Sequence, residues 1–311
     1  MATKTKVTFH IGLEKTGTDS FQRFCSEQRA LLRRHGVLYP TTSLAFGEYS
    51  HEPLVACYLS YGDPSIRSSG RDRPEVLRSL MAEITDARIE HVLISGEHFS
   101  SRFREPEIDR LAADFSAFDC RIAVVVREHR ARLYSAYSQS VLAGRHMTLD
   151  AYCDEVFHPD NPYMRYAETI GAWERVFGHT NLHVFCHARG QDIIPILCDA
   201  LFPGELVLPR SNVYWDNLSI GPGATEWLRR VNHMIARIPG TASPTARDAL
   251  YQPRRRLARL LARFNRNRDP RLWRLTEQNS RRLSKIVEID NAWLAQRHGI
   301  QLRDAAVTTT E

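Results

Sequence analysis

Residues 10–20 read HIGLEKTGTDS, and this stretch decides the fold. It begins inside an apolar run that predicts a short β-strand over 7–11, and it leads into a helical pattern over 20–34. A strand, a glycine-containing loop and a helix in this order place backbone N–H groups at a helix N-terminus, which favours an anion. Lys15 adds an ammonium group and its neighbours add hydroxyl groups, so we predict an anion site in this loop.

The spacing of Gly12 and Gly17 is that of a P-loop, G-x-x-x-x-G-K-[ST], but the lysine is displaced. Thr18 follows the second glycine, where a nucleoside triphosphatase has its lysine, and Lys15 lies two residues before that glycine. Only four of the 42 basic residues are lysines, so a lysine in this loop is informative. The alternative interpretation is an ordinary turn with Thr18 as the N-cap of the helix.

Strand and helix patterns alternate along the chain as far as residue 221. Further strands are predicted over 37–39, 91–95, 121–127 and 181–187, and further helices over 54–59, 74–87, 105–117, 131–143, 148–157, 163–178 and 190–202. This alternation predicts an α/β fold with a central, mostly parallel sheet flanked by helices. From residue 222 the pattern is all helical. We therefore expect one domain over 1–311, with an α/β core over 1–221 and a basic helical part over 222–311.

The composition excludes several classes of protein. With 311 residues, 43% of them hydrophobic and 25% charged, the chain can bury a sizeable core, which excludes intrinsic disorder. No run approaches 18 apolar residues and no signal-peptide pattern is present, so we expect no membrane span. The six cysteines show no C-x-x-C spacing, which argues against zinc and thioredoxin-like sites and favours a reducing cytoplasm.

Positive charge gathers near the C-terminus. The net charge is +6, and residues 229–303 carry 17 Arg and one Lys against five acidic residues. An amphipathic, arginine-rich helix is predicted over 254–268. Several roles stay open for this helix. It could cover an anionic ligand, or bind a polyanionic acceptor or an acidic membrane surface, or it could simply be a solvated helix face. We expect no nucleic acid, because no recognised binding module is present.

A second motif follows the most apolar predicted strand. Residues 127–137 read REHRARLYSAY, with Arg127 at the strand end and Ser135 eight residues later. Together with residues 10–20, this motif resembles sulfotransferases that use 3′-phosphoadenosine 5′-phosphosulfate (PAPS). Bacterial members commonly have a 5′-phosphosulfate loop of the type H-I-G-x-x-K-T-G-T-T-S, and the family's 3′-phosphate motif is R-D-P-x-x-R-x-x-S-x-Y. Here Asp19 replaces the second Thr, and Glu128-His129 replaces Asp-Pro.

The resemblance extends over nearly the whole chain. Residues 95–97 (SGE) are similar to the S-S-E segment of the family, residues 166–178 to its Y-x6-W helix, and residues 291–300 to an N-x-W-L-A-x-R-x-G-I ending. Residues 40–75 and 239–275 match least. The resemblance implies a P-loop-NTPase-like sulfotransferase fold.

The resemblance also implies a reaction and a set of residues. A sulfuryl group would pass from PAPS to a hydroxyl or amine acceptor, most simply in a glycan or glycolipid, releasing adenosine 3′,5′-bisphosphate without a metal ion. Lys15 would contact the oxygen between the 5′-phosphate and the sulfuryl group, and Arg127 and Ser135 would hold the 3′-phosphate. The 5′-phosphate would be bound by Thr16, Gly17, Thr18, Asp19 and Ser20.

The general base has three candidates in the sequence. Glu97 resembles the glutamate base of the heparan-type sulfotransferases, while His51 and His98 are alternatives because the cytosolic branch of the family uses histidine. Two other functions stay open. A nucleotide kinase or triphosphatase would need Mg²⁺ and a lysine directly after Gly17, and a non-catalytic polyanion-binding protein would not depend on Lys15.

Overall fold

The computed structural model describes residues 4–44, 49–59, 70–188, 191–202, 220–238, 243, 249–250, 253–254, 256–257, 260 and 273–302. The chain divides into two compact units. The first unit comprises Met1–Arg127, Arg165–Asp216 and Trp293–Leu302. The second unit comprises Glu128–Met164, Asn217–Ala292 and Arg303–Glu311. The expectation of one domain over 1–311 stays a prediction.

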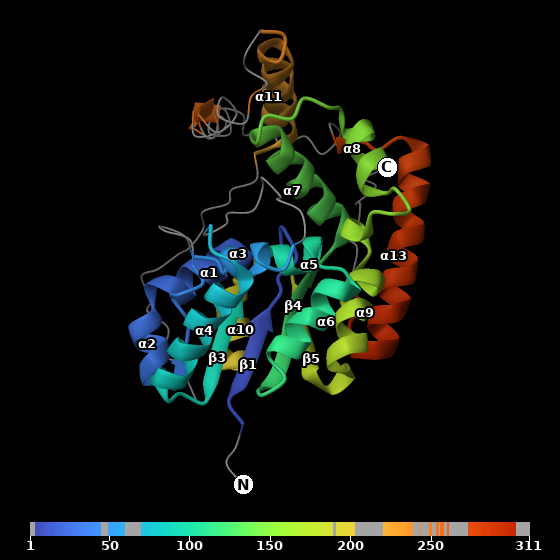
Figure 1. Cartoon of the computed structure of the whole chain (residues 1–311). Helices are drawn as coiled ribbons and strands as arrows, with labels where there is room; N and C mark the ends of the chain where they lie inside the picture. The colour runs from blue at the N-terminus through green and yellow to red at the C-terminus, as the bar shows by residue number, and fades with distance from the viewer. Residues whose placement is uncertain are drawn as a thin grey trace. The chain divides into compact units, whose positions relative to one another are not determined.

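The first unit is built on a parallel sheet (Figure 1). Within the described residues it has five strands in the order β2-β3-β1-β4-β5. They are β1 (Lys6–His10), β2 (Val37–Leu38), β3 (His91–Ser95), β4 (Asp119–Arg127) and β5 (Leu182–His187). His10 is in register with Ser95 on one side and with Ala123 on the other, so β1 and β3 end side by side. All the strand pairs are parallel, which confirms the predicted α/β fold class.

Helices cover both faces of this sheet. One face packs against α4 (Arg73–Ala87), α6 (Glu105–Asp114) and α9 (Tyr166–Phe177), together with the short α3 (Glu52–Ala56) and α5 (His98–Arg102). The other face packs against α1 (Thr18–Glu27), α2 (Arg29–Arg34) and α10 (Ile193–Leu201). Alternate residues of β1, such as Val7 and Phe9, point to the first face, and residues 122–126 of β4 are buried on both. Burial on both faces explains the unbroken apolar run of β4 in the sequence.

Two local differences from the sequence prediction have physical reasons. The helix predicted over 20–34 is interrupted at Gln28, whose backbone (φ −101°, ψ 22°) is not helical. The interruption lets Leu32 pack with Val37 of β2 in one apolar cluster. The helix α5 was not predicted, because five residues are too few to show a helical period.

The second unit is helical and has its own core. It holds α7 (His129–Leu142), α8 (Leu149–Val156), the 3₁₀ turn Pro162–Met164, α11 (Pro222–Ile235) and most of α13 (Glu277–His298). Its apolar core includes Leu133, Tyr137, Leu228 and Leu283. Most of the arginine-rich helix predicted over 254–268 lies outside the described residues. No helix in the described part of the chain is both long and apolar enough to span a bilayer.

Candidate functional site

Two glycines shape the loop that joins β1 to α1. Gly12 (φ +44°) and Gly17 (φ +94°) lie in the left-handed region of backbone conformation, which favours glycine. A Cβ atom on Gly12 would lie 2.8 Å from the side chain of Thr18, and one on Gly17 would lie 2.9 Å from Ile193. Gly17 is also the N-cap of α1 and Thr18 is the first helical residue, so the interpretation of Thr18 as N-cap is wrong.

The hydroxyl groups of the loop bind the loop itself. Thr16 donates a hydrogen bond to the carbonyl oxygen of Leu13 at 2.6 Å, and Thr18 donates to the same oxygen at 3.3 Å. A hydroxyl group has one proton to donate, so these contacts use it. An anion would therefore meet the backbone N–H groups of residues 15–20, where the first turn of α1 leaves donors without intrahelical acceptors.

Lys15 has an unusual backbone conformation that joins the two sequence motifs. Its φ of 71° is in the left-handed region, which costs a non-glycine residue roughly 1–2 kcal/mol. Its carbonyl oxygen accepts a hydrogen bond from Nη1 of Arg127 at 3.1 Å. Arg127 ends β4, and its own carbonyl oxygen accepts a hydrogen bond from the hydroxyl of Tyr166 at 2.6 Å. Two residues that are 112 positions apart in the chain are thus brought into contact.

The other predicted phosphate ligands occupy varied positions. Asp19 is exposed and Ser20 is half-buried, both in the first turn of α1. Ser135 is half-buried on α7, which belongs to the second unit, and its assignment to the 3′-phosphate stays a prediction. Glu128, which stands where the family motif has Asp, is the N-cap of α7: its carboxylate accepts hydrogen bonds from the backbone N–H groups of Arg130 and Ala131 at 2.6 Å each. The helix was predicted to begin at residue 131, and the structure begins it two residues earlier, directly after Glu128.

Glu97 lies beside the loop. It follows β3 after Gly96, and its Cα atom would be 3.4 Å from a Cβ atom on Gly12. Burial, followed by the nearby charges of Asp19 and Glu14, raises the pKa of Glu97 from 4.5 to about 8, although Lys15 and His98 oppose the shift. A carboxyl group with a pKa near neutrality can exchange protons at the pH of the reaction, which suits a general base.

The two histidine candidates have structural partners. His51 is fully buried; its Nδ1 accepts a hydrogen bond from the backbone N–H of Ser95 at 3.0 Å, and its Nε2 lies 3.1 Å from the carbonyl oxygen of Pro40. Burial lowers the pKa of His51 to about 4, so the ring is neutral. His98 lies 3.0 Å from a carboxylate oxygen of Glu52. Burial opposes the shift, but the acidic neighbours raise the pKa of His98. Both histidine rings thus have partners within the first unit.

Two acidic residues were not foreseen from the sequence: Glu14, whose charge acts on Glu97, and Glu52, the partner of His98. Glu14 lies in the loop and contacts Arg102 at 3.8 Å, and Glu52 begins α3 and pairs with His98. Glu14 stands in the quoted motif, at a position that the family pattern leaves variable. Glu52 comes from a stretch that resembles the family least, so no motif pointed to it.

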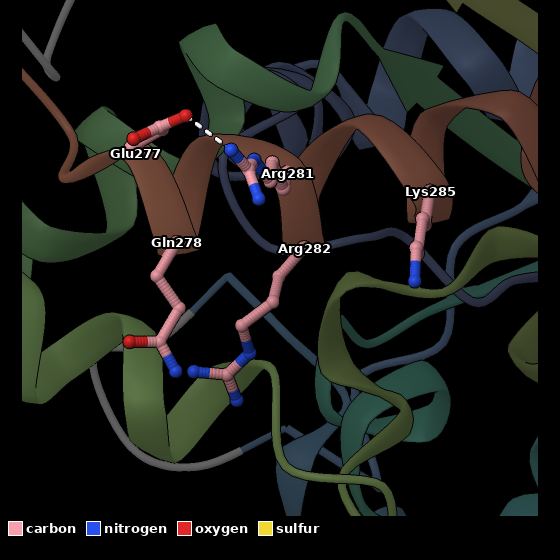
Figure 2. Close-up of a pocket in the computed structure, with 5 residues that line it drawn as sticks. All are labelled: Glu277, Gln278, Arg281, Arg282 and Lys285. Carbon is pink, nitrogen blue, oxygen red and sulfur yellow. Dashed lines mark hydrogen bonds and ion pairs between the residues drawn. The ribbon is translucent and has the colours of Figure 1, made fainter.

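A separate pocket lies on α13 in the second unit. Figure 2 shows its lining, which is Glu277, Gln278, Arg281, Arg282 and Lys285. Arg281 pairs with Glu277, and Arg282 pairs with Asp154 of α8 at 2.6 Å. None of the predicted site residues lines this pocket. Local acidic residues compensate much of its positive charge.

The chain is similar to a solved structure but to no family model or curated sequence. No family model matches the chain, and no curated protein matches its sequence. Among solved structures, a sulfotransferase from Alicyclobacillus acidocaldarius is similar over 85% of this chain and 97% of its own, at 17% identity and a TM-score of 0.42.

Proposed function

We propose that this protein is a sulfotransferase that takes its sulfuryl group from PAPS and transfers it to a hydroxyl or amine group. The hydrogen bond from Arg127 to the carbonyl oxygen of Lys15 carries the proposal. It joins, at the carboxyl ends of two neighbouring strands, the residue that resembles a 5′-phosphosulfate ligand and the residue that resembles a 3′-phosphate ligand. Ligands of open α/β sheets bind at this edge.

The residues of the loop suit a nucleotide with phosphate groups at both positions. The backbone can approach a phosphate closely at Gly12 and Gly17, because neither has a side chain, and the N-terminus of α1 favours negative charge. A guanidinium group has five N–H donors, so Arg127 can hold the carbonyl of Lys15 and still grip a phosphate. PAPS, when bound, supplies the sulfuryl group.

Two side chains would act directly on the reacting groups. The ammonium group of Lys15 would neutralise the charge that develops on the leaving phosphate, a task for which a compact charge is better suited than a planar guanidinium. Glu97 would take the proton of the acceptor, as its position beside Gly12 and its raised pKa allow. The hydroxyl groups of Thr16 and Thr18 would keep the loop in shape.

The acceptor that we propose is a carbohydrate hydroxyl group, in a glycan or a glycolipid. The resemblance of Glu97 to the base of the heparan-type enzymes supports this choice. A cytoplasmic location and a peripheral contact with a membrane belong to the same proposal. A screen of glycans, lipids and small alcohols as acceptors would identify the substrate.

Calorimetry tests the nucleotide assignment. We expect adenosine 3′,5′-bisphosphate to bind at least about tenfold more tightly than AMP, because a hydrogen bond to a charged group contributes about 1.5–3 kcal/mol. Arg127→Lys should remove most of this preference, since lysine lacks the planar fork. Arg121→Lys, in the same strand, is the matched control and should keep it. Equal affinities for the two nucleotides would contradict the assignment, and tight Mg²⁺-dependent binding of ATP would favour the kinase alternative.

A further inference from the structure

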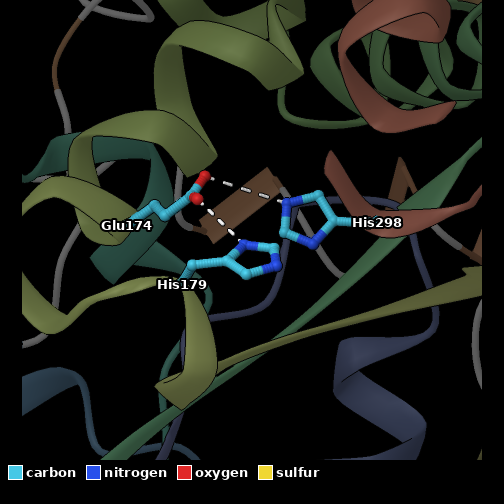
Figure 3. Close-up of side chains that lie close together, drawn as sticks. All are labelled: Glu174, His179 and His298. Atoms are coloured by element: carbon cyan, nitrogen blue, oxygen red, sulfur yellow. Dashed lines mark hydrogen bonds and ion pairs between the residues drawn. The ribbon is translucent and has the colours of Figure 1, made fainter. Parts of the chain in front are cut away.

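Three potential metal ligands meet in the first unit, two of them close together in the sequence and the third near the C-terminal end of α13 (Figure 3). Glu174 lies on α9, His179 begins the 3₁₀ turn His179–Asn181, and His298 ends α13. Nδ1 of His179 lies 2.9 Å from Oε1 of Glu174, and Nε2 of His298 lies 3.9 Å from Oε2. One donor atom from each residue lies within 4.8 Å of the other two.

His298 provides an independent sign that something is bound here. Its side chain is only 6% exposed, and within the described residues its Nε2 has no hydrogen-bond partner. The 3.9 Å that separates this nitrogen from the carboxylate is too long for a hydrogen bond. A buried polar atom without a partner is costly, and Figure 3 shows this one turned toward Glu174. The ring is held there by Trp293, whose centroid is 5.0 Å away.

We infer that Glu174, His179 and His298 bind one divalent transition-metal ion, with zinc as the best match. Zinc binds imidazole nitrogen at about 2.0–2.1 Å and carboxylate oxygen at about 2.0–2.2 Å, so neighbouring ligands of a tetrahedral site lie roughly 3.3 Å apart. The observed distances are 2.9 Å from His179 to Oε1 of Glu174 and 3.9 Å from His298 to Oε2, so side-chain movements of about an ångström would bring both nitrogens and one carboxylate oxygen around a single ion. Imidazole ligands favour zinc over magnesium or calcium. Three protein ligands leave the fourth position to water.

The surroundings of the site permit metal entry and limit affinity. His179 is 50% exposed, which gives an ion a path from solvent. Oε1 of Glu174 accepts from Arg297 and lies next to His179. The other oxygen, Oε2, lies on the side of His298. When Nδ1 of His179 binds the metal, the ring would carry its proton on Nε2, and its hydrogen bond with Glu174 would be replaced by the bond to the metal. The positive charge of Arg297 opposes a second cation, so we expect micromolar rather than nanomolar affinity.

A metal here would have a structural effect and no part in sulfuryl transfer. It would tie the end of α13 to α9 and to the turn that follows α9, all within the first unit. Binding only to the folded chain would raise its stability in proportion to the logarithm of the metal concentration. The site is thus independent of the function proposed above.

Titration of the full-length chain without a histidine tag tests this inference. We expect calorimetry to show one zinc ion bound per chain, and no heat from magnesium. His298→Gln and His179→Gln should each weaken zinc binding at least tenfold, while His158→Gln, at an exposed histidine on the second unit, should not change it. Zinc should also raise the melting temperature of the wild-type chain but not of His179→Gln, whose exposed side chain can be replaced without disturbing the core. Absence of binding, or equal binding by wild type and His179→Gln, would overturn the inference.

Discussion

Glu97 and Glu174 both lie in the first unit, but their pKa values are shifted in opposite directions from the ordinary value of a glutamate. Burial raises the pKa of both. At Glu97 the neighbouring charges of Asp19 and Glu14 add to burial, and the pKa rises to about 8. At Glu174, hydrogen bonds from Arg297 and His179 outweigh burial and lower the pKa.

The difference teaches that the neighbours of a carboxyl group decide what it can do. A glutamate among acidic groups holds its proton close to neutral pH, so it can exchange that proton with a substrate. A glutamate among cationic groups stays charged, so it can hold an arginine, a histidine or a metal ion. The first kind suits catalysis and the second suits structure.

The largest expected effect is the loss of catalysis when Glu97 can no longer accept a proton. Glu97→Gln should slow sulfuryl transfer by about 10²–10⁴-fold, the usual contribution of a general base. Nucleotide affinity should change little. The wild-type rate should rise by about tenfold per pH unit below pH 8, and the variant should lose this rise. Glu168→Gln, at an exposed glutamate of α9, is the control. If Glu97→Gln transferred the sulfuryl group at the wild-type rate, Glu97 would not be the general base, and His98 or His51 would be the remaining candidates.

A smaller effect is expected on stability at Glu174. Glu174→Gln should lower the free energy of unfolding by about 1 kcal/mol at pH 7, since Arg297 is half exposed and its pairing is screened. The lowered pKa means that this stabilisation is present above pH 4.5 and is lost as the pH falls through the folded-state pKa. Thermal melts at pH 7 and in acid would measure it. The matched control is Glu277→Gln, whose pair with Arg281 is exposed and should contribute almost nothing. A pH-independent difference would contradict the assigned ionic role.

The pH dependence of stability at Glu97 is expected to be opposite in sign to that at Glu174. Because its folded-state pKa is raised, its contribution is full below pH 4.5 and is lost as the pH rises from 4.5 to about 8. Glu97→Gln, which stays neutral, should therefore gain stability relative to wild type across this range. Chemical unfolding at pH 5 and pH 9 would measure the change, which a pKa of about 8 sets at several kcal/mol because each pKa unit corresponds to about 1.4 kcal/mol. If Glu97→Gln instead lost stability relative to wild type between pH 5 and pH 9, the folded-state pKa of Glu97 would not be raised and its described environment would be wrong.

Much of the first unit follows from sequence patterns. The apolar runs predicted the strands of the sheet, and the alternation with helices predicted their parallel pairing. The residues of the loop were found because Gly12, Lys15 and Gly17 lie within six positions of one another, and the backbone conformation explains both glycines. The contact of Arg127 with Lys15 is compatible with the two motifs, but neither motif specifies which atoms meet.

The partners of individual side chains, whether near or far in the sequence, could not be predicted. The hydroxyl of Thr16 was expected to face a phosphate, but the structure turns it to the carbonyl of Leu13. His51 was a candidate base, and only the folded chain shows both of its nitrogens within reach of backbone atoms of Ser95 and Pro40. Likewise the zinc ligands are more than 100 residues apart between His179 and His298, and no local spacing joins them.

Transfer of label from sulfur-labelled PAPS to a mixture of glycans, lipids and small alcohols tests the central claim most directly. The measurement would compare wild type with Lys15→Ala and, as a control, Lys4→Ala, at an exposed lysine before β1. We predict labelled product with wild type and Lys4→Ala, and a loss of at least about 10²–10³-fold with Lys15→Ala, the effect of removing one group that stabilises the developing charge. Circular dichroism should show that the variant keeps its fold. Undiminished transfer by a folded Lys15→Ala variant would contradict the account.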